Sequence, residues 1–310
     1  MPIIKTLRGV GYTPGVNLFG VPYDWRLPVD ALMQSTNLLG TNNTFETDLR
    51  LLIERAFNAS GGLRVHIVTH SMGGPTLLYF LNRRSLAWKD QFVASFVPIA
   101  GPFAGSLKAL RAMVSGDDVG LEVPLVKWSL LNENDVMNNF RQAGSASYIA
   151  PDYDYYGAQI FVSTPKRNYS AADFGQMFID LGAPVSARLW HRTKDLISDL
   201  HHPQVTSYCL YGWNVATEIH LTYPIGFPAD PKVANQPVID YSDLGDGTGE
   251  SSSESGFFFF FAQVPLVPLF SLVECKVLTC EMDDWHSSDF CRTGSTRSTR
   301  RTRSTVASTS

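Results

Sequence analysis

The stretch Val65-His66-Ile67-Val68-Thr69-His70-Ser71-Met72-Gly73-Gly74 decides the fold of this chain. It begins as an apolar run, and residues 74–82 after the serine carry leucines and aromatic side chains at helical spacing. A strand, a sharp turn that holds a serine, and then a helix form the context of a nucleophile elbow. We therefore expect Ser71 to be a nucleophile, with the backbone N–H of Met72 facing a developing oxyanion at the start of the helix.

Small residues must flank a serine in such a turn, because the turn is tight and the helix crosses the strand closely. Gly73 and Gly74 meet that need. Thr69 stands where the usual pattern has a glycine, and its branched side chain weakens the match. A serine between small residues also arises by chance, so the interpretation depends on the strand before it and the helix after it.

Composition narrows the class of protein. The 310 residues suffice for one large α/β domain or two small ones, and 44% hydrophobic with 17% charged residues is typical of a globular chain. The net charge of −4 gives no reason to expect nucleic acid as a partner. The four cysteines, at positions 209, 275, 280 and 291, have no zinc-like spacing. We expect no metal and no cofactor.

The sequence contains few signals for the location of the protein in the cell. Three sequons begin at Asn42, Asn58 and Asn168, which favours a secretory route, although sequons are common by chance. The first residues lack the long apolar region of a signal peptide. The apolar stretch 257–273 is shorter than the ~20 residues of a membrane span and contains two prolines, so we expect it not to cross a membrane.

The order of apolar runs predicts a parallel sheet. Residues 65–69 and 92–100 read as buried strands on either side of the elbow helix, and this βαβ spacing is typical of α/β folds. Residues 47–59 have one apolar helical face. Residues 1–30 are rich in glycine and proline and predict loops around short strands, and 205–211 returns to strand character.

Residues 102–200 differ from the core: they mix short helical patterns with loops and many aromatic residues, which indicates a cap or lid or, alternatively, a separate helical domain. After residue 248 the composition changes abruptly, to serine and glutamate, then five phenylalanines, and finally Arg, Ser and Thr. We divide the chain into a core with the elbow (1–101), a cap or lid (102–200), a continued core with an acidic loop (201–248), a non-native insert (249–263), a core remnant with a histidine (264–291) and a low-complexity tail (292–310).

A serine nucleophile needs a histidine base and a carboxylate to orient it, and in α/β-hydrolases these follow the serine in the order acid, then histidine. The acidic, turn-rich stretch 240–248 supplies the acid, and among the seven histidines only His286 comes after it. Asp246 is the preferred acid because glycines flank it, and Asp243 is the second choice.

Several stretches together resemble the lecithin:cholesterol acyltransferase family, which includes lysosomal phospholipases and acyltransferase-like enzymes of plants and fungi. The matching stretches extend over about residues 20–248 and are Gly20–Arg26 with its PYDWR, Thr69–Asn82, Trp88–Asp90, Pro98–Ser106, Ser115–Asp117 and Gly245–Thr248 with its GDGT.

The resemblance implies an α/β-hydrolase fold with a mostly parallel sheet and a helical cap or lid insertion. It implies an acyl-enzyme mechanism on phospholipid or another acyl ester, with Ser71 as nucleophile and Asp246 as acid, while the segment around His286 resembles the family's histidine segment. The expected substrate is phospholipid or acylglycerol at a membrane or lipoprotein surface. The expected location is the secretory pathway, the vacuole or lysosome, or the extracellular space.

Departures from the family pattern concern both ends and one insertion. The family's continuation after GDGT resumes at Val264, so 249–263 reads as inserted, and five phenylalanines followed by Ala262-Gln263 is what a retained intron end would encode. Without these 15 residues, His286 would follow Asp246 by 25 positions. Family segments before PYDWR and after the histidine are not matched, which predicts a fold incomplete at both ends. Two alternatives stay open: an inactive or mis-spliced product of the same family, and a general lipase or esterase.

Overall fold

The computed structural model describes residues 2–36, 38–117, 122–123, 128–129, 132–210, 215–227, 235–245 and 257–262, with backbone alone for residue 2, 122–123, 128–129, 243–245 and 257–262. The chain divides into two units, Met1–Cys280 and Glu281–Ser310, and the second lies outside the described residues. The following paragraphs concern the first unit.

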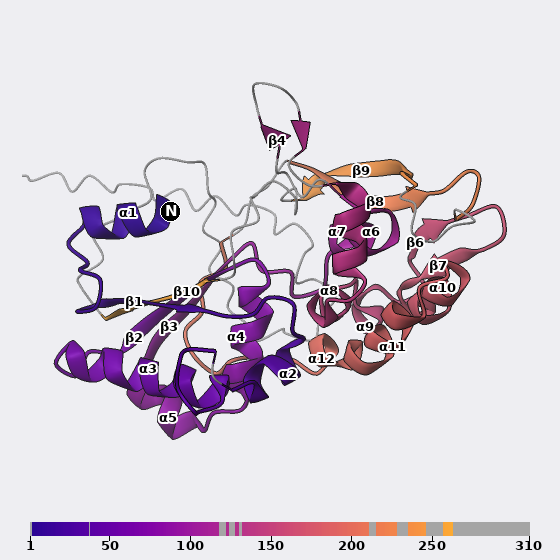
Figure 1. Cartoon of the computed structure of the whole chain (residues 1–310). Helices are drawn as coiled ribbons and strands as arrows, with labels where there is room; N and C mark the ends of the chain where they lie inside the picture. The colour runs from indigo at the N-terminus through magenta and orange to yellow at the C-terminus, as the bar shows by residue number, and fades with distance from the viewer. Residues whose placement is uncertain are drawn as a thin grey trace, which may run out of the picture. The chain divides into compact units, whose positions relative to one another are not determined.

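A four-stranded sheet carries the elbow and has the order β1-β10-β2-β3 (Figure 1). Strands β2 (Val65–His70) and β3 (Val93–Ile99) are parallel. The helices α4 (Gly73–Asn82) and α5 (Leu86–Phe92) connect them. This arrangement confirms the βαβ unit expected from the apolar runs, because parallel neighbours require such a crossover.

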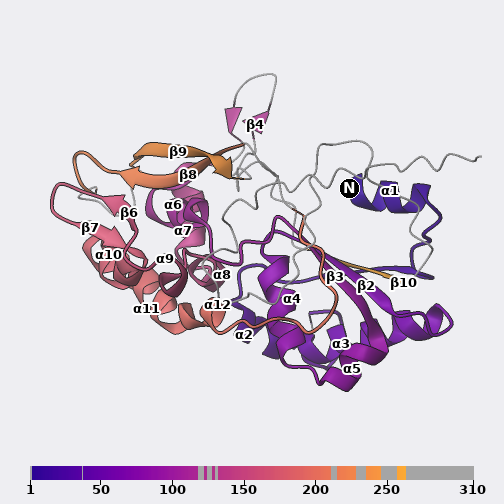
Figure 2. The ribbon, with the colours of Figure 1, turned by 180° about the vertical axis from the view of Figure 1, so that it is seen from behind.

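Helices cover both faces of this sheet. Figures 1 and 2 show α1 (Pro2–Gly9) on one side and α3 (Phe45–Ala59) on the other. On the α1 side, Leu7 packs with Leu18 and Val68. On α3, Leu49, Ile53 and Ala56 form a fully buried stripe, and the Thr44 side chain caps the helix by accepting from the Thr47 N–H, at 3.3 Å between Thr47 N and Thr44 Oγ1. Between α1 and α3 the chain forms strand β1 (Leu18–Pro22) and helix α2 (Val29–Gln34).

The segment with five consecutive phenylalanines is a strand of this sheet. Strand β10 (Phe257–Ala262) pairs antiparallel with β1 on one side and with β2 on the other. Sequence composition did not predict that these phenylalanines belong to a globular core, so their pairing is known from the structure alone. Their proposed origin in a retained intron concerns the transcript and stays a prediction.

Proline substitution can test whether β10 lies between two strands of the sheet. Phe259 pairs with Gly20 and with Val68, so proline there removes a ladder hydrogen-bond donor from a central strand. We expect Phe259→Pro to lower the free energy of unfolding by about 1–3 kcal/mol, the cost of leaving a buried backbone carbonyl without its donor, measured by urea denaturation. Phe257→Pro is the matched control, because Phe257 begins the strand and pairs with β1 alone, so its effect should be smaller. Equal stabilities for the two variants would place Phe259 outside the sheet.

A second sheet has the strand order β7-β6-β8-β9 and shares an apolar core with several short helices. Strand β6 is parallel to β8 and antiparallel to β7, while β8 and β9 form an antiparallel pair. The strands are β6 (Ile160–Ser163), β7 (Asn168–Ser170), β8 (Val215–Thr222) and β9 (Val238–Gly245), and a separate two-stranded ribbon consists of β4 (Glu122–Val123) and β5 (Trp128–Ser129).

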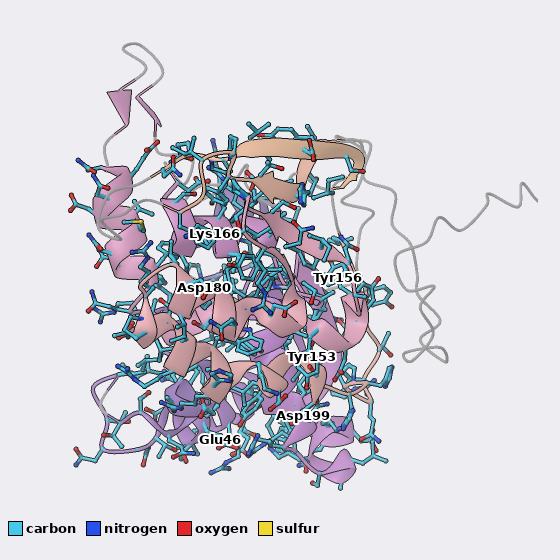
Figure 3. All side chains as sticks on the ribbon, turned by 90° about the vertical axis from the view of Figure 1, so that its right-hand side faces the viewer. Glu46, Tyr153, Tyr156, Lys166, Asp180 and Asp199 are labelled. Carbon is cyan, nitrogen blue, oxygen red and sulfur yellow. The ribbon has the colours of Figure 1, made fainter. Side chains whose placement is uncertain are left out.

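The helices of this part share one apolar core. Phe174, Met177 and Phe178 are fully buried in it, together with Val162 and Leu221 from the sheet. Figure 3 shows Tyr153 and Tyr156, both from α9 (Tyr153–Tyr156); the Tyr156 ring packs edge-on against Phe161 at 5.0 Å between centroids. The other helices are α6 (Leu107–Ser115), α7 (Glu133–Phe140), α8 (Gly144–Tyr148), the 3₁₀ helix η1 (Ala171–Asp173), α10 (Phe174–Asp180), α11 (Pro184–Thr193) and α12 (Asp195–Ser198).

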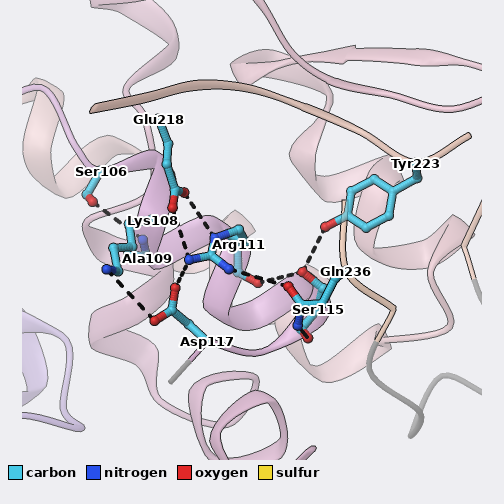
Figure 4. Close-up of polar contacts among 9 residues, drawn as sticks. All are labelled: Ser106, Lys108, Ala109, Arg111, Ser115, Asp117, Glu218, Tyr223 and Gln236. Atoms are coloured by element: carbon cyan, nitrogen blue, oxygen red, sulfur yellow. Dashed lines mark hydrogen bonds and ion pairs between the residues drawn. The ribbon is translucent and has the colours of Figure 1, made fainter. Parts of the chain in front are cut away.

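A buried ionic network joins helix α6 to strand β8 (Figure 4). The Arg111 guanidinium pairs with Asp117, whose side chain is fully buried, and with Glu218 at 2.9 Å. The Tyr223 hydroxyl donates to Ser115 Oγ at 2.9 Å. The positive charge of Arg111, with Lys108 Nζ 3.9 Å from Asp117, compensates the burial of the two carboxylates, so this network links α6 to β8.

Two sequence expectations change in detail, and a third agrees with the structure. Residues 2–9 form helix α1, where the glycine- and proline-rich composition predicted loops. Residues 240–245 belong to strand β9, so most of the predicted acidic loop is extended. Residues 207 and 210 make parallel bridges to Phe96 and Ile99 of β3, which agrees with the strand character expected for 205–211. Among the described helices, none combines the length and the apolar character that a membrane span requires.

Candidate active site

Ser71 lies at the carboxyl end of β2, at the point where the chain turns into α4. Its backbone has a φ of 51°, in the left-handed region that side chains other than glycine rarely adopt. The Ser71 N–H donates to the carbonyl of Ile99 at 2.9 Å, and the Ser71 carbonyl accepts from the Gly74 N–H at 2.8 Å. The serine is thus held in a strained turn between a strand and a helix, as the elbow interpretation predicts.

The neighbouring strand β3 ends in a second turn of the same kind. Ala100 has a φ of 49°, and its N–H donates to the Leu210 carbonyl at 2.7 Å. Because β2 and β3 are parallel, both turns lie at the same edge of the sheet. In open α/β sheets, ligands bind outside the carboxyl ends of the strands, so this edge is the candidate active site.

Close packing explains the glycine after the elbow. A Cβ atom on Gly74 would lie 3.2 Å from the Cα of Gly101 and 3.2 Å from the Phe103 ring. These contacts are tighter than ordinary van der Waals distances, so a side chain here would push α4 away from the loop that follows β3. The structure therefore supports the expectation that a small residue is required at position 74.

Met72 begins the helical conformation, with φ −52° and ψ −22°. Its carbonyl accepts hydrogen bonds from the backbone N–H of Thr76 at 3.2 Å and from the Thr76 hydroxyl at 2.8 Å. This position at the first turn of α4 is where an oxyanion donor of an elbow lies.

Two buried tyrosines interact with residues of the elbow helix. Burial raises the pKa of the Tyr23 hydroxyl well above its ordinary value, and a hydrogen bond with Thr76 partly opposes that rise. Burial also raises the pKa of Tyr148, with smaller contributions from Tyr23 and Tyr79. The PYDWR stretch was identified from the sequence as a family motif. The structure shows that its tyrosine, Tyr23, contacts Thr76 near the start of α4.

The same stretch also contacts α7 and α8. The Trp25 ring lies 5.5 Å from that of Phe140, and the Arg26 carbonyl accepts from the Ser145 N–H at 3.3 Å. Asp24 and Arg26 form a two-pronged ion pair with contacts of 2.8 and 2.7 Å. This exposed pair shapes the loop but contributes little stability by itself.

The structure describes the elbow, but it does not describe the side chains of the predicted acid and base. Asp246 follows the last residue of β9 directly, and both Asp246 and His286 lie outside the described residues. Asp243, the second choice for the acid, is on β9, and its side chain also lies outside them. Within the described ranges, no group of three or more His, Cys, Asp or Glu side chains could hold a metal ion.

Comparison with known proteins identifies the class of protein. The family model "Lecithin:cholesterol acyltransferase" matches residues 1–198, and the chain belongs to this family. Its described strands and helices form a mixed α/β structure with parallel strands, consistent with the α/β-hydrolase fold of that family.

Individual relatives are similar over most of this chain. Human lysosomal phospholipase A and acyltransferase is 32% identical over 254 residues, which covers 82% of this chain and 55% of the relative. Human phosphatidylcholine-sterol acyltransferase is 31% identical over 252 residues, covering 81% and 52%. A solved structure, "The crystal structure of Tle4-Tli4 complex", has a TM-score of 0.40 and 14% identity over 68% of this chain and 50% of that one. The chain spans about half the length of these curated relatives.

The strain at Ser71 makes a stability prediction that does not depend on activity. A left-handed backbone costs a residue with a Cβ about 1–2 kcal/mol, whereas glycine adopts it freely. We expect the free energy of unfolding of Ser71→Gly to exceed that of Ser71→Ala by about 1 kcal/mol, a figure that includes the greater freedom of glycine in the unfolded chain. Ser71→Gly should therefore unfold at a higher urea concentration.

Two controls define that result. Ala100→Gly should also be stabilising because Ala100 has the same backbone region, and Ala56→Gly should be destabilising because Ala56 is within helix α3. If Ser71→Gly were as destabilised as Ala56→Gly, the strained turn would be absent in solution.

Two buried threonines at the elbow give a matched comparison. Thr69 is fully buried, and its hydroxyl has no hydrogen-bond partner among the described residues, whereas the Thr76 hydroxyl bonds the Met72 carbonyl. We expect Thr69→Val to be neutral or stabilising and Thr76→Val to cost about 1 kcal/mol in the free energy of unfolding. Thermal unfolding of both variants measures the difference, and the opposite order would contradict the hydrogen bonding described for this turn.

Proposed function

We propose that this chain is a lipid-ester acyltransferase or phospholipase of the phospholipase A type that works through an acyl-enzyme on Ser71. The single observation that carries the proposal is the left-handed Ser71 between a parallel strand and a helix. Family membership supports the substrate class, since relatives at 31–32% identity are named for phospholipase and acyltransferase activities.

In the proposed mechanism, His286 removes the proton from Ser71 as its oxygen attacks the carbonyl carbon of a lipid ester. Asp246 holds the imidazole ring and stabilises its positive charge. The backbone N–H of Met72 donates to the oxyanion of the tetrahedral intermediate. The lipid alcohol then leaves with the proton from His286, and an acyl-serine remains.

In the second half of the proposed reaction, water or a lipid hydroxyl accepts the acyl group. His286 removes a proton from this acceptor, the acceptor oxygen bonds to the acyl carbon, and the bond from that carbon to Ser71 Oγ breaks as His286 returns the proton to Ser71. No metal or cofactor takes part in the proposal. Residues 102–200 are proposed as the cap, with aromatic and aliphatic residues of 102–165 forming the acyl pocket. Phospholipid or acylglycerol at a membrane or lipoprotein surface is the proposed partner, and a secretory, vacuolar, lysosomal or extracellular location fits it.

Replacement of Ser71 tests this proposal directly. We expect the full chain to release fatty acid from phosphatidylcholine vesicles, or to transfer it to an added lipid alcohol, and Ser71→Ala to lose at least ~10³-fold of that rate. Thin-layer chromatography of radiolabelled lipid distinguishes the two products.

The control is the fold of the variant. Ser71→Ala should show the same circular dichroism and the same thermal transition as the parent chain. If the parent and a folded Ser71→Ala variant process lipid equally, the proposed function is wrong. Activity of the parent on p-nitrophenyl butyrate with none on vesicles would instead favour a general esterase.

A further inference from the structure

Three side chains of the second sheet form a hydrogen-bonded chain of serine, histidine and aspartate. The Ser163 hydroxyl oxygen lies 2.9 Å from Nε2 of His220, and Nδ1 of His220 lies 3.1 Å from Oδ2 of Asp240. Their order along the chain is Ser, His, Asp, which differs from the α/β-hydrolase order in which the histidine follows the acid. A catalytic triad is recognised by geometry and roles and not by sequence order.

The register of the strands places the three residues on one face of the sheet. His220 on β8 lies directly opposite Asp240 on β9, and Ser163 on β6 lies opposite Thr222, two residues further along β8. Successive side chains of a strand point to opposite faces, so the neighbouring residues belong to the other face. Those neighbours, Val162, Leu221 and Ile239, pack in the apolar core.

The face that carries the three residues is open to solvent. The Asp240 side chain is 62% exposed, the His220 side chain is 22% exposed, and Ser163 is half-buried. Ser163 is therefore partly accessible to a small reagent, and the imidazole lies between two hydrogen-bond partners.

The hydrogen bonds determine which nitrogen carries the proton when His220 is neutral. An ionised Asp240 is an acceptor, so Nδ1 is the protonated nitrogen and Nε2 accepts from the Ser163 hydroxyl. The Thr222 hydroxyl lies 3.4 Å from Nδ1 and is a weaker second contact. This tautomer is the one in which an imidazole can take a proton from serine.

We propose that Ser163, His220 and Asp240 form a second activated serine, separate from Ser71, that reacts with small activated acyl esters. Ser163 Oγ bonds to the carbonyl carbon, and His220 Nε2 takes the hydroxyl proton. The bond between that carbon and the leaving oxygen breaks, and the leaving alcohol departs with the proton from His220. Water then attacks the acyl-serine with His220 as the base, which releases the carboxylic acid and restores Ser163.

Labelling with a small fluorophosphonate tests the proposal on the full chain. The serine oxygen bonds to phosphorus, fluoride leaves, and the hydroxyl proton passes to His220. In the Ser71→Ala background, we expect the peptide that contains Ser163 to be labelled. Adding His220→Gln should slow that labelling by about 10²-fold or more, since a positioned base contributes that factor. Asp240→Asn should slow it as well, because the amide no longer holds the required tautomer.

Internal controls separate activation from simple exposure. Ser198 donates to the Asp152 carboxylate at 2.5 Å and Ser170 donates to Asp173 at 2.7 Å, and neither bond includes an imidazole. We expect both serines to stay unlabelled. Matching thermal transitions for Ser71→Ala with and without His220→Gln would show that the second variant is folded.

The outcomes decide the proposal. Labelling of Ser163 that depends on His220 supports it, and hydrolysis of p-nitrophenyl acetate by Ser71→Ala, lost on adding Ser163→Ala, supports it further. Absence of label at Ser163 in a folded Ser71→Ala chain overturns it and leaves the three residues as a structural contact. Labelling at the same rate with and without His220 also overturns it. Vesicle hydrolysis depends on Ser71 alone, so it distinguishes failure of this inference from failure of the proposed lipid activity.

Discussion

The candidate site depends on one constraint, the left-handed backbone of Ser71. A turn with a φ of 51° at a residue with a side chain is unfavourable by itself, so its surroundings must hold it. The Ile99 carbonyl accepts the Ser71 N–H, and the glycine at 74 lets α4 approach the loop after β3. The strain and the proposed role of Ser71 as nucleophile have the same origin, because the turn that costs stability is the turn that lifts the serine of an elbow above the sheet.

The sheet that supports this turn is assembled from distant parts of the chain. Strand β10 is antiparallel to both of its neighbours, so β1 and β2 are parallel to each other with one strand position between them. Residues 257–262 occupy that position and pair with strands that precede them by about 190 to 240 residues. Such pairing closes a large loop, so folding of the core includes a contact of high sequence separation.

Local patterns predicted the elements near the elbow. The apolar run at 65–69, the helical spacing after Ser71 and the apolar face of residues 47–59 each depend on neighbours within a few residues. The structure confirms them, and of the four residues expected on that face Leu49, Ile53 and Ala56 are fully buried while Leu52 is half-buried. Family membership, expected from PYDWR and GDGT together, is confirmed by the match over residues 1–198. Asp246 and His286 stay predictions, since both lie outside the described residues.

The features that sequence reasoning missed arise from contacts between distant segments. Nothing in the composition of five phenylalanines indicates which strands they join. The contact of Tyr23 with Thr76 joins the PYDWR stretch to α4 across more than 50 residues. The hydrogen-bonded chain of Ser163, His220 and Asp240 depends on the register of three strands. Asp240 lies on strand β9, where the sequence had predicted an acidic loop.

Trapping of the acyl-enzyme tests whether Ser71 is the nucleophile. The full chain is mixed with phosphatidylcholine vesicles, quenched in acid within the first turnovers, digested and analysed by mass spectrometry. We predict a fatty acyl ester on the peptide that contains Ser71, absent from the same peptide of Ser71→Ala. A chain that hydrolyses the lipid but carries its acyl group elsewhere, or forms no acyl-serine at all, would contradict it.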